Sequence, residues 1–265
     1  MHHDTAITAR RVTDEADRRH VIGVLAATYH AEKRWVSDPA AQIPPDDLTR
    51  DDVAWFVLTL GDIPAGALRV LFDPSYAQYA AYGLTLIDPT LDVEEFLHRS
   101  RIAEVGRFAV RPEYRGQFMI AAALMRAATQ ETVVRGYTHL VTDVFEDDPH
   151  TPYHFHTRVL GFCPVATHDV GELRCSSRRI TLVLDLNSAY GRLNKRNNWL
   201  YRYLTSGWDA SLHHRFLSET STAARLPGTE DTAPARAREL VENDGLKLIA
   251  PRLQNGGSVR FAVGD

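Results

Sequence analysis

The stretch RIAEVGRFAVRPEYRGQFMI, residues 101–120, decides the fold because it predicts a strand, a tight basic turn and the start of a helix. Residues 102–110 have the alternating character of a half-buried strand, and Pro112 ends it. An apolar helix is predicted from Phe118 to Arg135, closed by Gly136. Unpaired N–H groups at a helix start, beside a glycine and an arginine, favour the binding of a phosphate group.

Within this strand, regular alternation assigns the side chains to two faces. One face is expected to carry Glu104, Gly106 and Phe108, and the other Val105, Arg107 and Ala109.

Four motifs resemble those of known acyltransferases. VRPEYRGQ (110–117) before an apolar helix resembles the cofactor-binding motif of the GNAT superfamily, and VLGF (159–162) resembles the motif that ends its domain. GALRV (66–70) and EVGRFAV (104–110) narrow the resemblance to acyl-homoserine-lactone synthases and long-chain N-acyl amino acid synthases. The resemblance covers about residues 5–187, which we expect to form one α/β domain (1–187).

The resemblance implies a GNAT-like mixed central sheet with splayed central parallel strands, flanked by helices. The second splayed strand is predicted at residues 138–145, and strands at 6–12, 53–60, 65–72, 162–168 and 178–186 complete the sheet. The pantetheine arm of the acyl donor is expected to lie in the splay like an extra strand, with a backbone N–H near Phe145 polarising the thioester carbonyl. The expected donor-binding residues are Phe108, Val110, Arg115, Gly116, Gln117 and Phe145.

The family turn continues Gly-x-Gly, whereas this chain has Phe118 and Ile120 at those positions. Side chains there are expected to crowd the diphosphate of coenzyme A. An acyl-phosphopantetheine on an acyl carrier protein has a single phosphodiester, so acyl carrier protein is at least as well supported a donor as acyl-CoA. Neither donor is expected to be tightly bound.

Composition limits the class of protein. The chain has 265 residues, 44% of them hydrophobic, which allows one large domain or a core with an appendage. A net charge of −4 argues against a dedicated nucleic-acid binder, and two cysteines indicate a reducing compartment. The N-terminus has no apolar signal core, and no apolar run is long enough to span a bilayer, so a cytoplasmic protein without integral membrane contact is expected.

Transfer of an acyl group to an amine needs a base for the ammonium and an acid for the leaving thiolate. Glu104 is the predicted base, directly or through a water, because it is a carboxylate within an apolar strand; its alternative role is to pair with Arg69 or Arg107. His156 is the predicted acid, from the position where many GNAT enzymes carry a tyrosine, with Tyr153 and His154 nearby. The spacing of His150, His154 and His156 fits no standard metal site, and no metal is expected.

The acceptor is expected to be a small amine. The proline-marked segment 31–52 forms either a wall or lid of the acceptor site or a plain surface connection, and residues 73–100 are an insertion that shapes the acyl or acceptor pocket. The resemblance implies a substrate-binding role for Arg34, Trp35, Arg69 and Arg107.

Residues 188–217 have a helical, basic and aromatic pattern. This extension is either a solvated helix face or a docking surface for an acidic acyl carrier protein, an anionic membrane surface being the weaker alternative. The docking residues would be Arg192, Lys195, Arg196 and Arg202. Residues 218–238 are expected to be a flexible linker and residues 239–265 a C-terminal tail.

The sequence thus predicts an N-acyltransferase that moves an acyl chain from a carrier-protein or coenzyme A thioester to an amino acid or similar amine. The alternatives are an acetyl-CoA-dependent GNAT acetyltransferase and a non-catalytic acyl-thioester binding module within a biosynthetic assembly.

Overall fold

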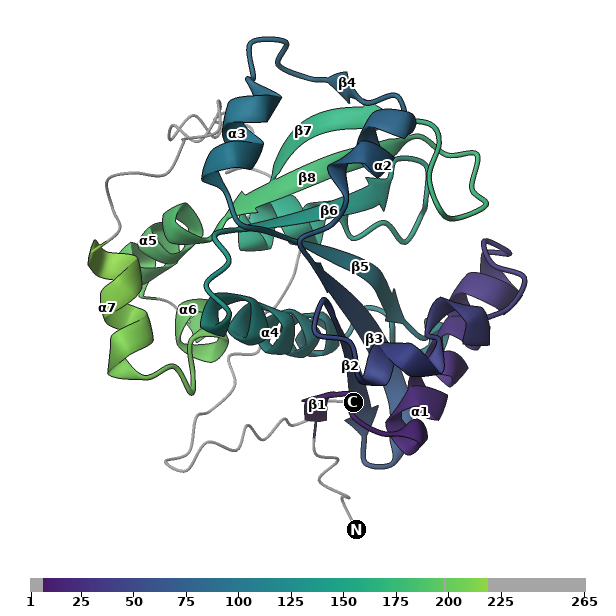
Figure 1. Cartoon of the computed structure of the whole chain (residues 1–265). Coiled ribbons are helices and arrows are strands. Elements are labelled where there is room, and N and C mark those ends of the chain that lie inside the picture. The colour runs from purple at the N-terminus through teal and green to yellow at the C-terminus, as the bar shows by residue number, and fades with distance from the viewer. Residues whose placement is uncertain (1–6, 198, 219–265) are drawn as a thin grey trace, which may run out of the picture. The chain divides into compact units, whose positions relative to one another are not determined.

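The computed structural model describes residues 7–197 and 199–218, which form a mixed sheet covered by helices (Figure 1). The strands are β1 (Ile7–Arg11), β2 (Val53–Leu60), β3 (Ile63–Phe72), β4 (Thr85–Leu86), β5 (Ile102–Val110), β6 (His139–Phe145), β7 (Cys163–His168) and β8 (Arg179–Asp185). Their order in the sheet is β1-β2-β3-β5-β6-β8-β7-β4. The mixed central sheet and the strands predicted at its centre are confirmed.

The helices differ in type. The α-helices are α1 (Glu15–Leu25), α2 (Tyr76–Ala81), α3 (Val93–Arg99), α4 (Phe118–Val134), α5 (Leu186–Arg196), α6 (Trp199–Leu204) and α7 (Ala210–Ser218). Two π-helices, η1 (Ala26–Glu32) and η5 (Phe155–Leu160), and three short 3₁₀ turns, η2 (Ala40–Gln42), η3 (Pro45–Leu48) and η4 (Pro112–Tyr114), complete the set for the described residues. Side-chain caps fix several helix starts; Asp14, for example, accepts the Asp17 N–H at the start of α1.

The two central strands, β5 and β6, are parallel and pair only briefly. Their register runs from Ile102 opposite His139 to Glu104 opposite Val141, and no pairing between them continues past that point in the described residues. Beyond it each strand keeps its outer neighbour, β3 for β5 and β8 for β6. The predicted splay is therefore present, and it leaves two diverging backbone edges, residues 105–110 of β5 and 142–145 of β6.

A β-bulge interrupts β5 at the level of this splay. The register with β3 shifts between Ala67 and Arg69, and Arg107 takes a left-handed conformation with φ +50°. The extra residue reverses the alternation: Val105 and Phe108 both contact the core on the α4 side. The sequence-based assignment of Phe108 to the Glu104 face and of Arg107 to the opposite face was therefore wrong, because regular alternation does not survive a bulge.

One face of the sheet packs against α4 and the helices that follow β8. Leu124, Met125 and Ile120 of α4 are fully or almost fully buried in this core. Gly66 in β3 permits the close approach, because a Cβ there would lie 2.9 Å from Leu124 Cδ1 and 3.1 Å from the Ala109 carbonyl oxygen.

The opposite face carries two separate apolar clusters. One joins α1, η1 and segment 36–43 to β2 and β3, with Val24, Trp55 and Ile43 among its buried members. The other joins α3 to β5, β6 and β8 through Phe96, Ile102 and Val183.

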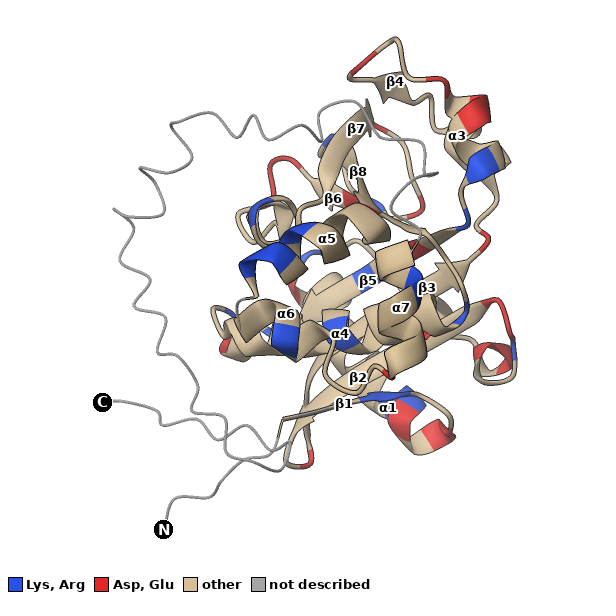
Figure 2. Cartoon of the chain, turned by 90° about the vertical axis from the view of Figure 1, so that its left-hand side faces the viewer, with Lys and Arg blue, Asp and Glu red and all other residues tan. Residues whose placement is uncertain are grey.

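The C-terminal extension is helical and is built from three helices, α5, α6 and α7. Asn197, with φ +39°, ends α5, and a turn separates α6 from α7. Tyr190, Leu204 and Phe216 place all three helices on the α4-side core. Figure 2 shows basic residues on α5 and α6. The predicted linker and tail, apart from Ser218, lie outside the described residues.

None of the described helices combines the length and the apolar character that crossing a membrane requires.

Candidate active site

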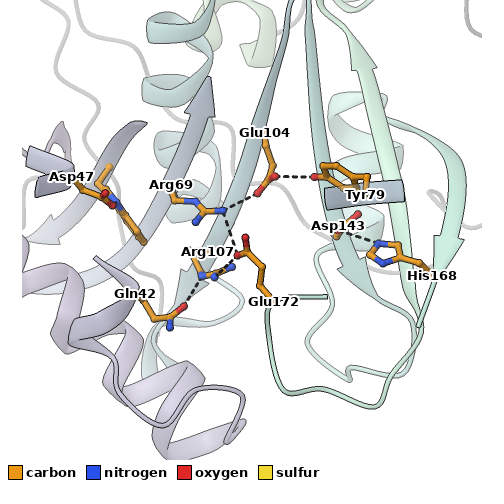
Figure 3. A network of polar contacts seen from close by, with 10 residues as sticks. Gln42, Asp47, Arg69, Tyr79, Glu104, Arg107, Asp143, His168 and Glu172 are labelled. Atoms are coloured by element: carbon orange, nitrogen blue, oxygen red, sulfur yellow. Dashed lines mark hydrogen bonds and ion pairs between the residues drawn. The ribbon is translucent and has the colours of Figure 1, made fainter. Parts of the chain in front are cut away.

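A connected group of charged side chains lies at the splay (Figure 3). Arg69 in β3 donates from Nη2 to Glu104 Oε1 over 2.9 Å, and the Tyr79 hydroxyl of α2 donates to Glu104 Oε2 over 2.8 Å. Both carboxylate oxygens of Glu104 therefore already accept a hydrogen bond. The side chains of Arg69 and Glu104 are only 12% and 18% exposed, so solvent screens this pair weakly.

Burial and charge set the protonation of the two partners of Glu104. Burial alone would lower the pKa of Arg69, but the Glu104 and Glu172 carboxylates outweigh it and raise that pKa. Burial, followed by the Glu104 charge, raises the pKa of Tyr79 well above its usual value. Arg69 therefore stays charged, and Tyr79 stays a neutral hydrogen-bond donor.

Arg107 extends the group toward two loops. Its Nη2 donates to Glu172 Oε2 over 2.7 Å, and its Nε donates to Gln42 Oε1 over 3.0 Å. Glu172 Oε2 also lies 3.8 Å from Arg69 Nη2. The bulge aims Arg107 at this cluster, and a non-glycine residue at positive φ stores strain of about 1–3 kcal/mol, as is common at functional sites.

A second polar pair, His168 and Asp143, lies beside Tyr79 on the same sheet face (Figure 3). His168 Nδ1 lies 2.6 Å from the Val170 carbonyl oxygen, and Nε2 lies 3.2 Å from Asp143 Oδ2. Burial lowers the pKa of His168, but Asp143 and the Val170 carbonyl outweigh this effect, and the net shift is upward. Both ring nitrogens face acceptors, which favours the protonated imidazolium.

The diverging edges carry the backbone groups expected to hold the donor. In an antiparallel ladder, alternate residues point their N–H and C=O groups toward the same neighbour. Because Arg111 N–H bonds to Ala65 and Glu146 N–H bonds to Arg178, this alternation turns the backbone groups of Phe108, Val110 and Phe145 away from β3 and β8.

Aromatic side chains from the α1 side border the same edges. The buried Tyr29 of η1 has its hydroxyl 3.4 Å from the Phe108 carbonyl oxygen, and burial raises its pKa to about 12. Trp35 lies with its ring centroid 4.2 Å from that of Phe145 and 5.3 Å from that of Tyr29. Segment 31–52 thus reaches the site, as its lid or wall interpretation requires. Arg34, also expected to bind substrate, is exposed with φ +57°.

The backbone of the basic turn before α4 has the conformation of an anion-binding site. Gly116 has φ +83° with open space where a Cβ would be, and no side chain caps the start of α4 at Gln117. The Arg115 guanidinium, however, forms a two-pronged ion pair with Glu32 of η1, which lowers the pKa of Glu32. A phosphate at this turn would therefore compete with Glu32 for Arg115.

The two side chains at the family glycine positions point away from the turn. Ile120 is fully buried in the α4-side core. Phe118 makes edge contacts with Phe155 of η5 and Trp199 of α6, each with ring centroids 5.6 Å apart. The expectation that both side chains crowd a diphosphate does not fit Ile120, since its direction is set by helix packing.

His156 lies inside the apolar core. It is fully buried among the rings of Phe108, Phe155 and Phe162, and burial lowers its pKa to about 3. Its two ring nitrogens have no partner among the described residues. A neutral, enclosed imidazole is poorly suited to protonate a thiolate near neutral pH, so this burial counts against the predicted role of His156. Tyr153, in the same segment, is half-buried.

The basic residues of the C-terminal extension have different surroundings. Lys195, Arg196 and Arg202 are exposed. Arg192 is half-buried and donates to the carbonyl oxygen of Gly161, over 3.2 Å. It therefore anchors α5 to the VLGF motif, and the three exposed cations form the surface that we call the basic surface.

Several residues of the site were not singled out from the sequence, among them Asp143, Glu172 and Gln42. Asp143 stands in a buried strand as Glu104 does, and the same argument would have found it. Glu172 and Gln42 gave no signal, because each meets Arg107 across 65 residues of chain.

Two solved acyltransferase structures share this architecture. The N-acyl amino acid synthase FeeM from uncultured soil microbes superposes with a TM-score of 0.54 at 16% identity, covering 75% of this chain and 98% of FeeM. The Drosophila melanogaster polyamine N-acetyltransferase, which forms N-acetylagmatine, superposes with a TM-score of 0.50 at 17% identity, covering 68% of this chain and 100% of that enzyme. These likenesses show that the chain has the GNAT-like fold that the sequence predicted.

The particular family follows from the sequence. The model of the family described as N-acyl amino acid synthase FeeM matches residues 25–172, more than half of the chain. The chain belongs to this family and is an N-acyltransferase. No curated protein sequence gives a significant match.

Proposed function

We propose that this enzyme transfers an acyl chain from a thioester, carried by acyl carrier protein or coenzyme A, to the amine of an amino acid or similar small acceptor. The observation that carries the proposal is the ion-pair group of Arg69, Glu104, Arg107 and Glu172 at the point where β5 and β6 diverge. It offers cations for a carboxylate and carboxylates for an ammonium, beside backbone edges able to hold a pantetheine arm.

The donor lies along the diverging edges in this proposal. Phe108 and Val110 on β5 and Phe145 on β6 bond the pantetheine amides, and the N–H near Phe145 polarises the thioester carbonyl. Gly116 and Gln117 at the start of α4 hold one phosphate, with Arg115 joining when Glu32 releases it.

The acceptor lies on the face with the charged group. Arg69 and Arg107 bind its carboxylate, while Trp35 and Arg34 border it on the side of η1. Glu104 takes the proton of the ammonium, directly or through a water. Because Arg69 and Tyr79 already occupy both oxygens of Glu104, one of these hydrogen bonds must lengthen as the proton arrives.

The leaving thiolate then needs a proton. Of the two candidates in this segment, we favour Tyr153 over His156, because His156 is enclosed and its pKa is about 3. The tetrahedral intermediate expels the thiolate, which takes the proton of Tyr153. The attacking nitrogen loses its second proton as the amide forms, and this proton restores Tyr153 through solvent, so that the products are the amide, the free thiol and one proton held by Glu104.

The test is product formation from defined donors. Purified enzyme is incubated with palmitoyl carrier protein, palmitoyl-CoA or acetyl-CoA and a mixture of amino acids, and the N-acyl products are identified by mass spectrometry. Long-chain N-acyl amino acids are expected. Acetylated products alone would support an acetyltransferase, and thioester binding without any product would support a silent binding module; either result would refute the proposal. Arg69→Gln serves as the matched inactive variant.

A further inference from the structure

The carboxylate of Glu172 sits on the two arginines of the site (Figure 3). Its Oε2 lies 2.7 Å from Arg107 Nη2 and 3.8 Å from Arg69 Nη2. A single carboxylate bridging two guanidinium groups is the arrangement that the carboxylate of an amino acid would adopt there.

The loop that carries Glu172, residues 169–178 between β7 and β8, is held firmly at its base. The buried Arg179 donates to the carbonyl oxygens of Asp169, over 2.6 Å, and Leu173, over 2.8 Å. Arg174 N–H bonds to the Trp35 carbonyl oxygen over 3.0 Å, which joins this loop to segment 31–52. These hydrogen bonds therefore hold the loop in a conformation that brings the Glu172 carboxylate to the two arginines.

The Glu172 side chain itself is the exposed member of the group. It is 38% exposed, against 11% for Arg107 and 12% for Arg69. The two arginines are therefore largely enclosed, and the solvent-exposed side chain of Glu172 covers them. Such a side chain can rotate away from the arginines while the loop base stays in place.

The charges around the two arginines allow another carboxylate to replace that of Glu172. Arg69 retains Glu104 when Glu172 leaves, whereas Arg107 retains the neutral oxygen of Gln42. A buried guanidinium left with a neutral partner is costly, so the position favours another carboxylate over water. The bulge at Arg107 keeps the guanidinium aimed there.

We propose that Glu172 occupies the carboxylate subsite of the acceptor in the free enzyme, and that the α-carboxylate of an amino acid displaces it. This inference rests on the proposed function, because it takes the acceptor to be an amino acid. It makes Glu172 a specificity residue: only an acceptor that carries its own carboxylate restores the charge balance of Arg107, and an amine without one leaves Glu172 in place.

The experiment measures binding without any thioester donor. Because aromatic side chains border the site, the probes are L-phenylalanine and L-phenylalaninamide, titrated calorimetrically into wild type and Glu172→Gln. Removing the competing carboxylate is expected to tighten binding of phenylalanine about two- to fivefold, the upper part of the range for a partly exposed ion pair, and to leave the amide unchanged. Asp169→Asn is the control, since its carboxylate lies in the same loop, is 76% exposed and faces Arg178.

Each other outcome overturns the inference. Equal or weaker phenylalanine binding by Glu172→Gln would mean that Glu172 does not compete with the acceptor carboxylate. An equal increase in affinity for phenylalanine and for phenylalaninamide would mean that Glu172 only blocks the site sterically. If the variant does not bind phenylalanine at millimolar concentration, the arginines do not form this subsite. Since no acyl transfer is measured, failure of the proposed function would appear separately, as binding without N-acyl product.

Discussion

Arg69 Nη2 lies 2.9 Å from Glu104 Oε1, and this ion pair joins β3 to β5 at the level where β5 leaves β6. The two roles considered for Glu104, base and partner of an arginine, are therefore combined in one side chain. Removing one member of a buried pair typically costs about 3–5 kcal/mol, because the other charge stays buried. A variant of Glu104 must be tested for stability as well as for rate.

Glu104→Gln is expected to lower kcat by about 10²- to 10⁴-fold, the usual range for loss of a general base. It is also expected to lower the free energy of unfolding, because Arg69 loses its charged partner. Steady-state kinetics at saturating acceptor, at a temperature where urea unfolding shows the variant to be folded, measure the first effect alone.

Tyr79→Phe is the matched control, because it removes the other hydrogen-bond partner of Glu104 and keeps the carboxylate. Its kcat is expected to stay within about tenfold of wild type. A folded Glu104→Gln enzyme with an unchanged kcat would reassign Glu104 to structure.

The sequence was sufficient for the architecture because the fold depends on local patterns. The apolar strands, the proline after β5 and the glycine after α4 are all readable within a few residues, and the motif around Arg115 indicated the GNAT superfamily. The bulge at Arg107 was not readable, since it depends on how β5 pairs with β3. Its effect was large, because one extra residue exchanged the faces of Arg107 and Phe108.

The charged group of the candidate site was predicted where its residues stand in strands. Arg69, Glu104 and Arg107 are charges within apolar runs, which is a signal in itself. Glu172 stands in a polar loop where a glutamate is ordinary, and only the folded chain brings it to Arg107. The surroundings of His156 could not be predicted either, because a histidine near the end of the domain gives no sign of being enclosed by three phenylalanine rings.

His156→Phe is expected to keep most of the activity. It is also expected to make the free energy of unfolding less sensitive to acid. The folded pKa of about 3 lies below the unfolded value of about 6.5, so the unfolded chain binds more protons between these values. Wild type is therefore expected to lose up to about 1.4 kcal/mol per pH unit, relative to the variant, as the pH falls below about 6.5. Urea unfolding between about pH 7 and pH 4.5 measures this difference. A folded variant with a hundredfold lower kcat would restore His156 as the acid.

His168 is expected to act on stability in the opposite direction. Its folded pKa is raised, so its contribution is complete below the unfolded value of about 6.5 and is lost as the pH rises through the folded pKa. Asp143→Asn removes the carboxylate that raises this pKa, while Arg179, Tyr82 and the Val170 carbonyl stay in place. The stability difference between wild type and Asp143→Asn should thus be larger at pH 6 than at pH 9. A difference that is constant across this range would mean that His168 and Asp143 do not form a charged pair.

The last prediction concerns the donor and the basic surface of Lys195, Arg196 and Arg202. Exposed cations attract an acidic carrier protein over long range, and salt weakens this attraction. We therefore expect acyl carrier protein to exceed the matching acyl-CoA in kcat/KM, with an advantage that shrinks as the ionic strength rises. Reversal of Arg196 and Arg202 to glutamate should slow the carrier-dependent reaction and leave the coenzyme A reaction nearly unchanged. Arg192 is excluded from this test, because its bond to Gly161 anchors α5 and its loss would disturb packing. If acyl-CoA is the better donor and the reversals have no effect, both the carrier hypothesis and the docking role of the basic surface are wrong.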